Sequence, residues 1–250
     1  MEDAIKTGEM LSTVRWYFEL KNLSLRKAMT FRCPLSAEGH RDLRLYYSQY
    51  FAGLLSATEL LLEKEYPRAK EFKKTLHEKL IFEGYPDGEK NYSYLRELRN
   101  SIIHRGADVT SAAHIVQDIP MMISPSPITN RSGAISLTSF GYYLIEVIAK
   151  CESVIADIFL AHFNEFKLFD IRLSQDEFVE HTRKQIDNSS SMPKLVKEAS
   201  RASVANIDFD EIHQSSIQSL LDVLKTDVIA EHGAVVVELL QQLSSTDHHE

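Results

Sequence analysis

Glycine and proline are scarce in this chain, with nine and seven residues among 250. Folds built only from β-strands need many turns rich in these two residues, so their scarcity argues against such folds. We therefore predict an all-α protein. The 44% hydrophobic and 26% charged residues form an ordinary globular composition, which argues against a disordered or fibrous chain.

Long apolar runs and a cysteine framework are also missing. No run reaches the roughly 18 apolar residues of a transmembrane helix, and the start Met1-Glu2-Asp3 does not resemble a signal peptide. The two cysteines, Cys33 and Cys151, form no CxxC pair and are expected to be reduced thiols. These absences predict a cytoplasmic protein that makes no membrane contact.

An excess of positive charge is missing too, because the formal net charge is −8. Taken alone, this value argues against a nucleic-acid binder. The acidity is uneven, however: residues 1–166 carry 20 Lys/Arg and 21 Asp/Glu, whereas residues 167–250 carry 8 and 15. The first two thirds are almost neutral, so the overall charge does not exclude RNA chemistry there.

The hydrophobic periodicity predicts helices along most of the chain. Apolar residues at helical spacing indicate helices over 10–27, 40–66, 68–82, 92–105 and 137–163, and a long irregular loop over 119–133. Beyond residue 169, a capping box at Ser174–Glu177 opens a short helix, and one or two more follow over 208–243. We predict a helical bundle over 1–166 and an acidic helical extension over 167–250. The long apolar seam of 137–163 needs a packing partner, within the bundle or across a dimer.

Most catalytic patterns are absent. The chain has no phosphate-binding glycine loop, no GxSxG, no HExxH and no Cys/His zinc spacing, so we expect neither a metal nor a cofactor. One segment stands out, residues 95–106, with the sequence LRELRNSIIHRG.

On a helix, this segment separates an apolar stripe from a polar face. Its apolar residues Leu95, Leu98 and Ile102 cluster within about 60° and are expected to be buried. Arg96, Asn100 and His104 face away from them, and Arg99 lies at the flank, about 140° from His104. A guanidinium fits phosphate oxygens, and an imidazole can move protons near neutral pH. Asn100 is placed at i, i+4 to orient His104. From spacing alone, a solvated helix face explains the same residues.

The hexapeptide Arg99-Asn100-Ser101-Ile102-Ile103-His104 resembles the R-x4-6-H motif of the HEPN superfamily, whose domains are four- or five-helix bundles. The resemblance covers about two thirds of the chain, and residues 167–250 have no counterpart in it. It implies a metal-independent endoribonuclease that acts on RNA as a homodimer, as a toxin or defence effector with a cognate antitoxin or regulatory protein. Arg99 would bind the scissile phosphate, and His104 would act as general base or acid. Asn100 would position His104 or the phosphate.

Several other residues are candidates for supporting roles. Arg96 and Arg105 extend the cationic cluster and are expected to bind substrate. Glu59, an acid in an apolar helix segment, is either a positioning partner of Arg96 or Arg99 or simply a helix-edge carboxylate. Tyr46, Tyr47 and Tyr50 could stack on bases, although core packing is favoured. The basic set of Lys70, Lys73, Lys74 and Lys79 could follow an RNA backbone, but interleaved glutamates favour a solvated face.

Two other functions compete with the nuclease. One is a non-catalytic HEPN-like module that binds nucleic acid, a nucleotide or a protein, and the other is a helical scaffold in which the motif is accidental. For the acidic extension, a packing or dimerisation role competes with that of a nucleic-acid mimic that covers the cleft.

Overall fold

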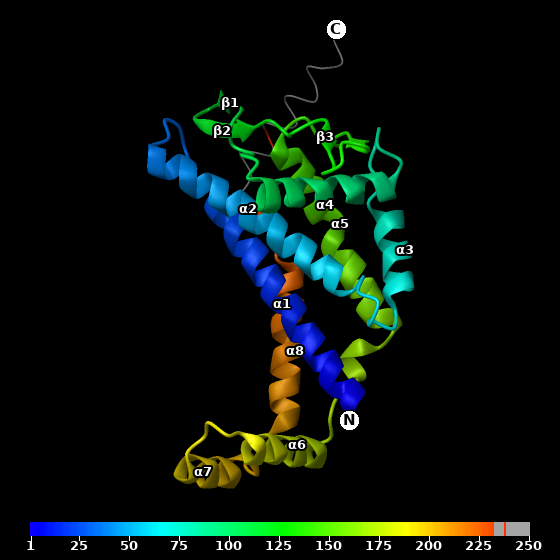
Figure 1. Cartoon of the computed structure of the whole chain (residues 1–250), viewed down its shortest axis with the longest axis vertical. Helices are drawn as coiled ribbons and strands as arrows, with labels where there is room; N and C mark the ends of the chain where they lie inside the picture. Colours follow the sequence, from blue (N-terminus) through cyan, green and yellow to red (C-terminus); the bar gives the residue numbers. More distant parts are fainter. Residues whose placement is uncertain (233–237, 239–250) are drawn as a thin grey trace.

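The residues that the structure describes are mostly helical, with 66% of them in helices and two small two-stranded sheets (Figure 1). This computed structural model describes residues 1–232 and 238. The prediction of a helical fold is confirmed, and its strictly all-α form needs correction because of the sheets. The bundle helices are α1 (Glu2–Ala28), α2 (Ala37–Leu60), α3 (Ala69–Lys79), α4 (Gly88–Arg105) and α5 (Leu144–Glu165). The strands are β1 (Ala113–Val116), β2 (Ile119–Met122), β3 (Ile128–Thr129) and β4 (Ser136–Leu137).

The second part of the chain forms a helical arm. It contains the short η1 (Leu168–Asp170), followed by α6 (Gln175–Asn188), α7 (Lys194–Val204), α8 (Phe209–Lys225) and α9 (Val228–His232). The predicted capping box is confirmed, because Ser174 N–H donates to Glu177 at 2.9 Å and Ser174 Oγ accepts from Glu177 N–H at 3.3 Å. Over 208–243, α8 and α9 agree with the predicted one or two helices, whereas α7 was not predicted. Residues 233–237 and 239–243 lie outside the described residues.

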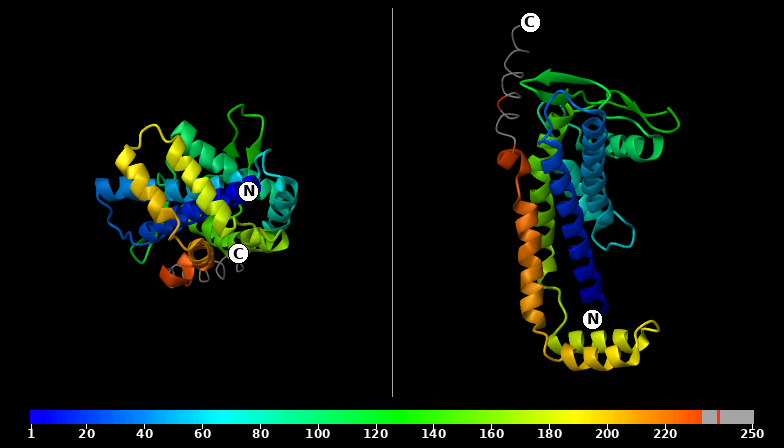
Figure 2. Two further views of the ribbon diagram at one scale, coloured as in Figure 1. Left: turned by 90° about the horizontal axis from the view of Figure 1, so that it is seen from below. Right: turned by 90° about the vertical axis from the view of Figure 1, so that its left-hand side faces the viewer.

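The long helices α1 and α2 run side by side in opposite directions, with α4 on the far side of α2 (Figure 1). Aromatic side chains fill the space between the helices: Phe18, Tyr50, Phe51, Phe72 and Phe159 are all fully buried. The hydrophobic core continues into the arm through Leu220, Leu224, Val228 and Ile229. Helix α8 packs along α1, so this part of the predicted extension has a packing role (Figure 2). The α6–α7 pair lies at the opposite end of the molecule from α4, so it does not cover the α4 helix of its own chain.

The α5 helix begins seven residues later than predicted. Leu137 belongs to β4, and Phe140 is buried in the segment between strand and helix. The carboxylate of Glu146 accepts hydrogen bonds from the backbone N–H groups of Tyr142 at 2.7 Å and Tyr143 at 3.3 Å. These bonds satisfy donors that have no partner within the helix, and therefore fix its first turn.

Two antiparallel hairpins occupy much of the region predicted to be an irregular loop. Strand β1 pairs with β2 and strand β3 with β4. The first hairpin turns at Gln117 and Asp118, which have φ values of 49° and 62°. Two consecutive residues in this left-handed region are typical of a two-residue hairpin turn, which asparagine and glycine usually occupy.

A buried histidine lies near the carboxyl end of α5. His162 of α5 is 1% exposed and packs against the rings of Phe72 and Phe166, while its Nε2 lies 2.7 Å from the Tyr66 hydroxyl. Burial lowers the pKa of His162 to about 4, because the apolar surroundings disfavour the charged imidazolium. The histidine is therefore neutral in the folded protein at neutral pH.

This histidine should make the fold sensitive to acid. The unfolded chain binds a proton near the ordinary histidine pKa of about 6.5, and the folded chain only near 4. The contribution of His162 to the free energy of unfolding totals about 3 kcal/mol. It is complete above about pH 6.5 and is lost as the pH falls to about 4. Urea unfolding of the wild type and His162→Phe between pH 4 and 7 would measure it. We expect the unfolding free energy of the variant to change less with pH than that of the wild type. An equal change in both proteins would contradict the lowered pKa of His162.

Candidate functional site

Helix α4 carries the predicted site, and its ends are fixed by local contacts. The carboxylate of Asp87 accepts a hydrogen bond from Lys90 N–H at 3.0 Å at the start of the helix. Gly106, with a φ of 69°, ends it as predicted. The apolar stripe of Leu95, Leu98 and Ile102 is buried, so the predicted orientation of the helix is confirmed.

A tight crossing holds the start of α4 against the end of α3. A Cβ atom at Gly88 would lie 1.8 Å from the carbonyl oxygen of His77, so only glycine fits there. The side-chain amide of Asn91 donates to the carbonyl groups of Leu80 at 2.8 Å and Tyr85 at 3.0 Å. These contacts set the position of α4 relative to α3.

Arg99 is anchored by Glu59 across the junction of α2 and α4. Its Nη2 donates a hydrogen bond to Glu59 Oε1, which also lies 3.5 Å from Arg96 Nε. The Arg99 side chain is only 17% exposed, and its Nε is buried without a hydrogen-bond partner. The structure therefore brings together Glu59, Arg96 and Arg99, as one of the two interpretations of Glu59 predicted. The positioning role of Glu59 stays a prediction.

His104 lies on the last turn of α4 and is exposed, while Asn100 is half-buried. Within the described residues, neither side chain has a hydrogen-bond partner, so the expected bond from Asn100 to His104 is not formed. Because Arg99 is directed toward Glu59 and His104 toward solvent, one chain does not bring these two side chains together. This matches their separation of about 140° on the helix.

Arg105 is turned back along α4 rather than toward Arg99. Its guanidinium pairs with the carboxylate of Glu97 and donates to Ser101 Oγ. The sequence gives no signal for this pairing, because Glu97 and Arg105 are eight positions apart, beyond the usual spacing of helix ion pairs. Arg105 therefore already has a carboxylate partner.

Arg44 of α2 is a further cation near the site, and it was not among the residues predicted from the sequence. Its Nη2 donates to the carbonyl oxygen of Gly106 at 2.8 Å, and its Nη1 lies 3.7 Å from Asp108. This places a permanent positive charge at the carboxyl end of α4, beside the last turn that carries His104. No local signal distinguished Arg44, because the contact joins residues 62 positions apart.

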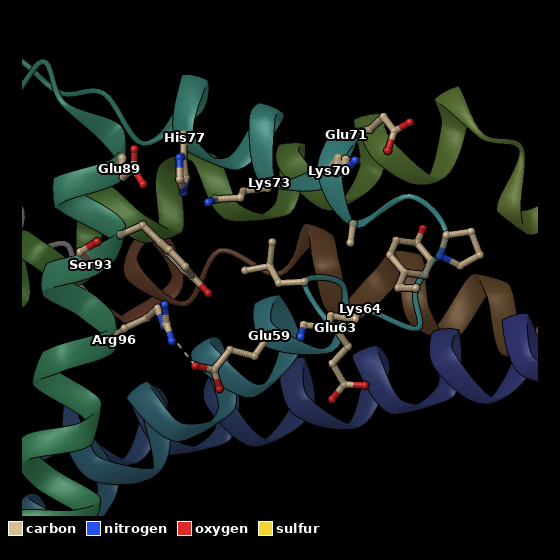
Figure 3. A pocket seen from close by; sticks show the side chains of 15 residues that line it. Glu59, Glu63, Lys64, Lys70, Glu71, Lys73, His77, Glu89, Ser93 and Arg96 are labelled. Carbon is tan, nitrogen blue, oxygen red and sulfur yellow. Dashed lines mark ion pairs between the residues drawn. The ribbon is translucent and has the colours of Figure 1, made fainter.

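A cavity of about 770 Å³ opens between the end of α2, α3 and the first half of α4 (Figure 3). Arg96 and Ser93 of α4 line it opposite Lys73 and His77 of α3. Burial lowers the pKa of His77 below its usual value. Since Arg96 lines the cavity and also pairs with Glu59, the cavity adjoins the Arg99 junction.

The other sequence candidates divide between surface and core. Of the predicted basic set, Lys70 and Lys73 line the cavity, and Lys74 lies 3.8 Å from Glu78 as part of a solvated face. Tyr47 and Tyr50 are buried, which confirms core packing. Tyr46 is half-buried against Phe31, with the ring centroids 6.1 Å apart.

Across the described part of the chain, no group of three or more His, Cys, Asp or Glu side chains is arranged to hold a metal ion. None of the described helices combines the length and apolar character needed to cross a lipid bilayer. No family model, curated protein or solved structure matches this chain.

Proposed function

We propose that the protein is a HEPN-type, metal-independent endoribonuclease that cleaves RNA at a cleft between two copies of the chain. In this proposal, Arg99 of one copy acts beside His104 of the other, with Asn100 and Arg96 contacting the substrate. Glu59 positions both arginines.

The observation that carries the proposal is the environment of Arg99. A structural arginine in a junction normally has all its donors paired, because an unsatisfied buried donor costs about 1–3 kcal/mol. Arg99 is anchored by Glu59 through one nitrogen only, and its Nε has no partner. The buried Nε is not open to a ligand, but Nη1 has no bond to a described residue and is not fully buried, so it retains its donors for phosphate oxygens. Its permanent charge would stabilise the negative charge that develops on the phosphorane.

The exposure of His104 supports its role in proton transfer. As a base, the imidazole would remove the proton of a ribose 2′-OH, whose oxygen then attacks the adjacent phosphorus. The bond from phosphorus to the 5′-oxygen breaks, and that oxygen leaves with the proton that the imidazole took from the 2′-OH. The products would be a 2′,3′-cyclic phosphate and a 5′-hydroxyl end.

The separation of Arg99 and His104 favours a second candidate. Within one chain the two side chains diverge, which suits a non-catalytic HEPN-like module that binds RNA, a nucleotide or a protein partner. The two candidates differ in whether RNA is cleaved. A toxin or defence role, with a cognate antitoxin or regulatory protein, belongs only to the first.

The direct test is incubation of the purified protein with total RNA, comparing the wild type with Arg99→Ala/His104→Ala. We expect the wild type to produce fragments ending in 2′,3′-cyclic phosphate, and the double variant to produce none. Binding of RNA without any cleavage by the wild type would support the second candidate and overturn the first.

A further inference from the structure

Helix α1 lies on the outside of the bundle (Figure 2), and one side of it carries exposed apolar residues. Trp16 is 61% exposed and Leu23 is 53% exposed, with the half-buried Leu20 between them. These three residues, together with Glu9 and Lys27, fall within about 40° of Trp16 around the helix axis. We call these five residues the α1 stripe. It is about 27 Å long from Glu9 to Lys27.

Neighbouring helices flank the α1 stripe without covering it. On one side, the Asn22 amide donates to the Val223 carbonyl of α8 at 3.0 Å. On the other side, Gly53 of α2 comes so close to Tyr17 that a Cβ atom would lie 2.9 Å from the Tyr17 carbonyl oxygen. Helix α4 lies beyond α2, so the α1 stripe and the Arg99 junction are separate faces.

The order of residues along the α1 stripe makes it complementary to itself. A two-fold axis near position 18 would pair two antiparallel α1 helices so that facing residue numbers sum to about 36. Trp16 then faces Leu20 of the second copy, and Glu9 faces Lys27. Both of these charged side chains are exposed, and neither forms an ion pair with any residue that the structure describes. The acid and the base are therefore free to pair across the axis at both ends.

We propose that the α1 stripe is an interface at which a second copy of this chain binds, with the two α1 helices antiparallel. The apolar centre supplies the attraction, since aromatic residues such as tryptophan carry much of the binding energy at interfaces. The terminal charges select the antiparallel orientation and register. One helix per copy is a small interface, so association is expected near micromolar concentrations. Copies that also meet at α4 would form an assembly of more than two chains.

Trp16 is the only tryptophan in the chain, so its fluorescence reports directly on this interface. In the full-length protein, we expect the emission to shift to shorter wavelength as the concentration rises, in parallel with dimerisation measured by sedimentation. Lys27→Glu would place two glutamates at each end and weaken association about tenfold or more. Glu9→Lys/Lys27→Glu exchanges the charges and should restore association to near the wild-type level.

The control is Lys79→Glu, which changes the charge by the same amount at an exposed site on α3, and it should associate like the wild type. Three results would overturn the proposal. They are association that is unchanged in Lys27→Glu, emission that does not depend on concentration, and emission typical of a buried indole in the dilute monomer. The last would mean that another part of this chain covers Trp16. RNA cleavage is assayed separately, so failure of the proposed nuclease would leave this test unaffected.

Discussion

Replacing Glu152 with alanine is expected to destabilise the fold by about 3–5 kcal/mol, because it leaves Lys21 as an unpaired charge in the core. Lys21 is 2% exposed and Glu152 is 6% exposed. Lys21 Nζ donates to Glu152 at 2.7 and 2.9 Å and to Asn22 Oδ1 at 2.8 Å, so its three protons are all satisfied. The Tyr50 hydroxyl also donates to Glu152 at 2.7 Å. Removing the carboxylate therefore strands two donors at once.

A double variant tests whether the loss in Glu152→Ala comes from the stranded lysine and the cavity or from the lost acceptor of Tyr50. In Lys21→Met/Glu152→Leu both charges are replaced by apolar side chains of similar volume, a change that is often neutral or stabilising for buried ion pairs. The Tyr50 hydroxyl would lose its acceptor, so a cost of about 1–3 kcal/mol remains. We expect the double variant to be more stable in urea than Glu152→Ala. If both were equally unstable, the single variant's loss would come from what the two variants share, the lost acceptor of the Tyr50 hydroxyl, and not from the stranded lysine.

This ion pair also shows a limit of what the sequence predicts. Lys21 lies in α1, near Phe18 and Leu25 on the face that is buried in the core. Its partner is 131 positions away in α5, and only the packing of α1, α2 and α5 makes them neighbours. Local periodicity therefore predicted the helix and most of its buried face, but not the charge inside the core.

Local signals predicted the buried face and the end of α4, but not its start, which lies at Gly88 and not at residue 92, and they were insufficient for the region before α5. In α4, the apolar spacing and Gly106 correctly predicted the buried stripe and the end of the helix. Before α5, Leu137 and Phe140 continue the same spacing as the helix that follows, although they belong to a strand and a connecting segment. Spacing alone cannot distinguish these cases. The hairpin at Gln117 and Asp118 lacks the usual turn residues, so it gave no signal.

For the candidate site, the sequence predicted which residues lie on α4 but not how their side chains are held. The contact of Glu59 with Arg96 and Arg99 followed from their chemistry and was among the alternatives. The pairing of Arg105 with Glu97 depends on side-chain conformations that helix spacing does not determine. The position of Arg44 depends on how α2 crosses α4.

Replacing His104 with alanine is expected to slow RNA cleavage by about 10²–10⁴-fold, the usual contribution of a general acid or base. The fold should be unaffected, because His104 is exposed and has no hydrogen-bond partner among the described residues. Cleavage rates and thermal unfolding, measured on the same preparation, would separate the two effects. His181→Ala is a suitable control, since this histidine lies on α6 at the far end of the molecule and should leave cleavage unchanged (Figure 1). Equal losses in both variants would argue against a catalytic role for His104.

Mixing two inactive variants tests whether the site is shared between chains. If Arg99 acts beside His104 of the other copy, a dimer of one Arg99→Ala chain and one His104→Ala chain has one site with both residues intact. Random assortment of equal amounts should restore about one quarter of the wild-type activity, because half the dimers are mixed and each has one working site. If both residues act within one chain, no intact site exists and the mixture stays inactive. Because the structure directs Arg99 toward Glu59 and His104 toward solvent, we expect the restored activity.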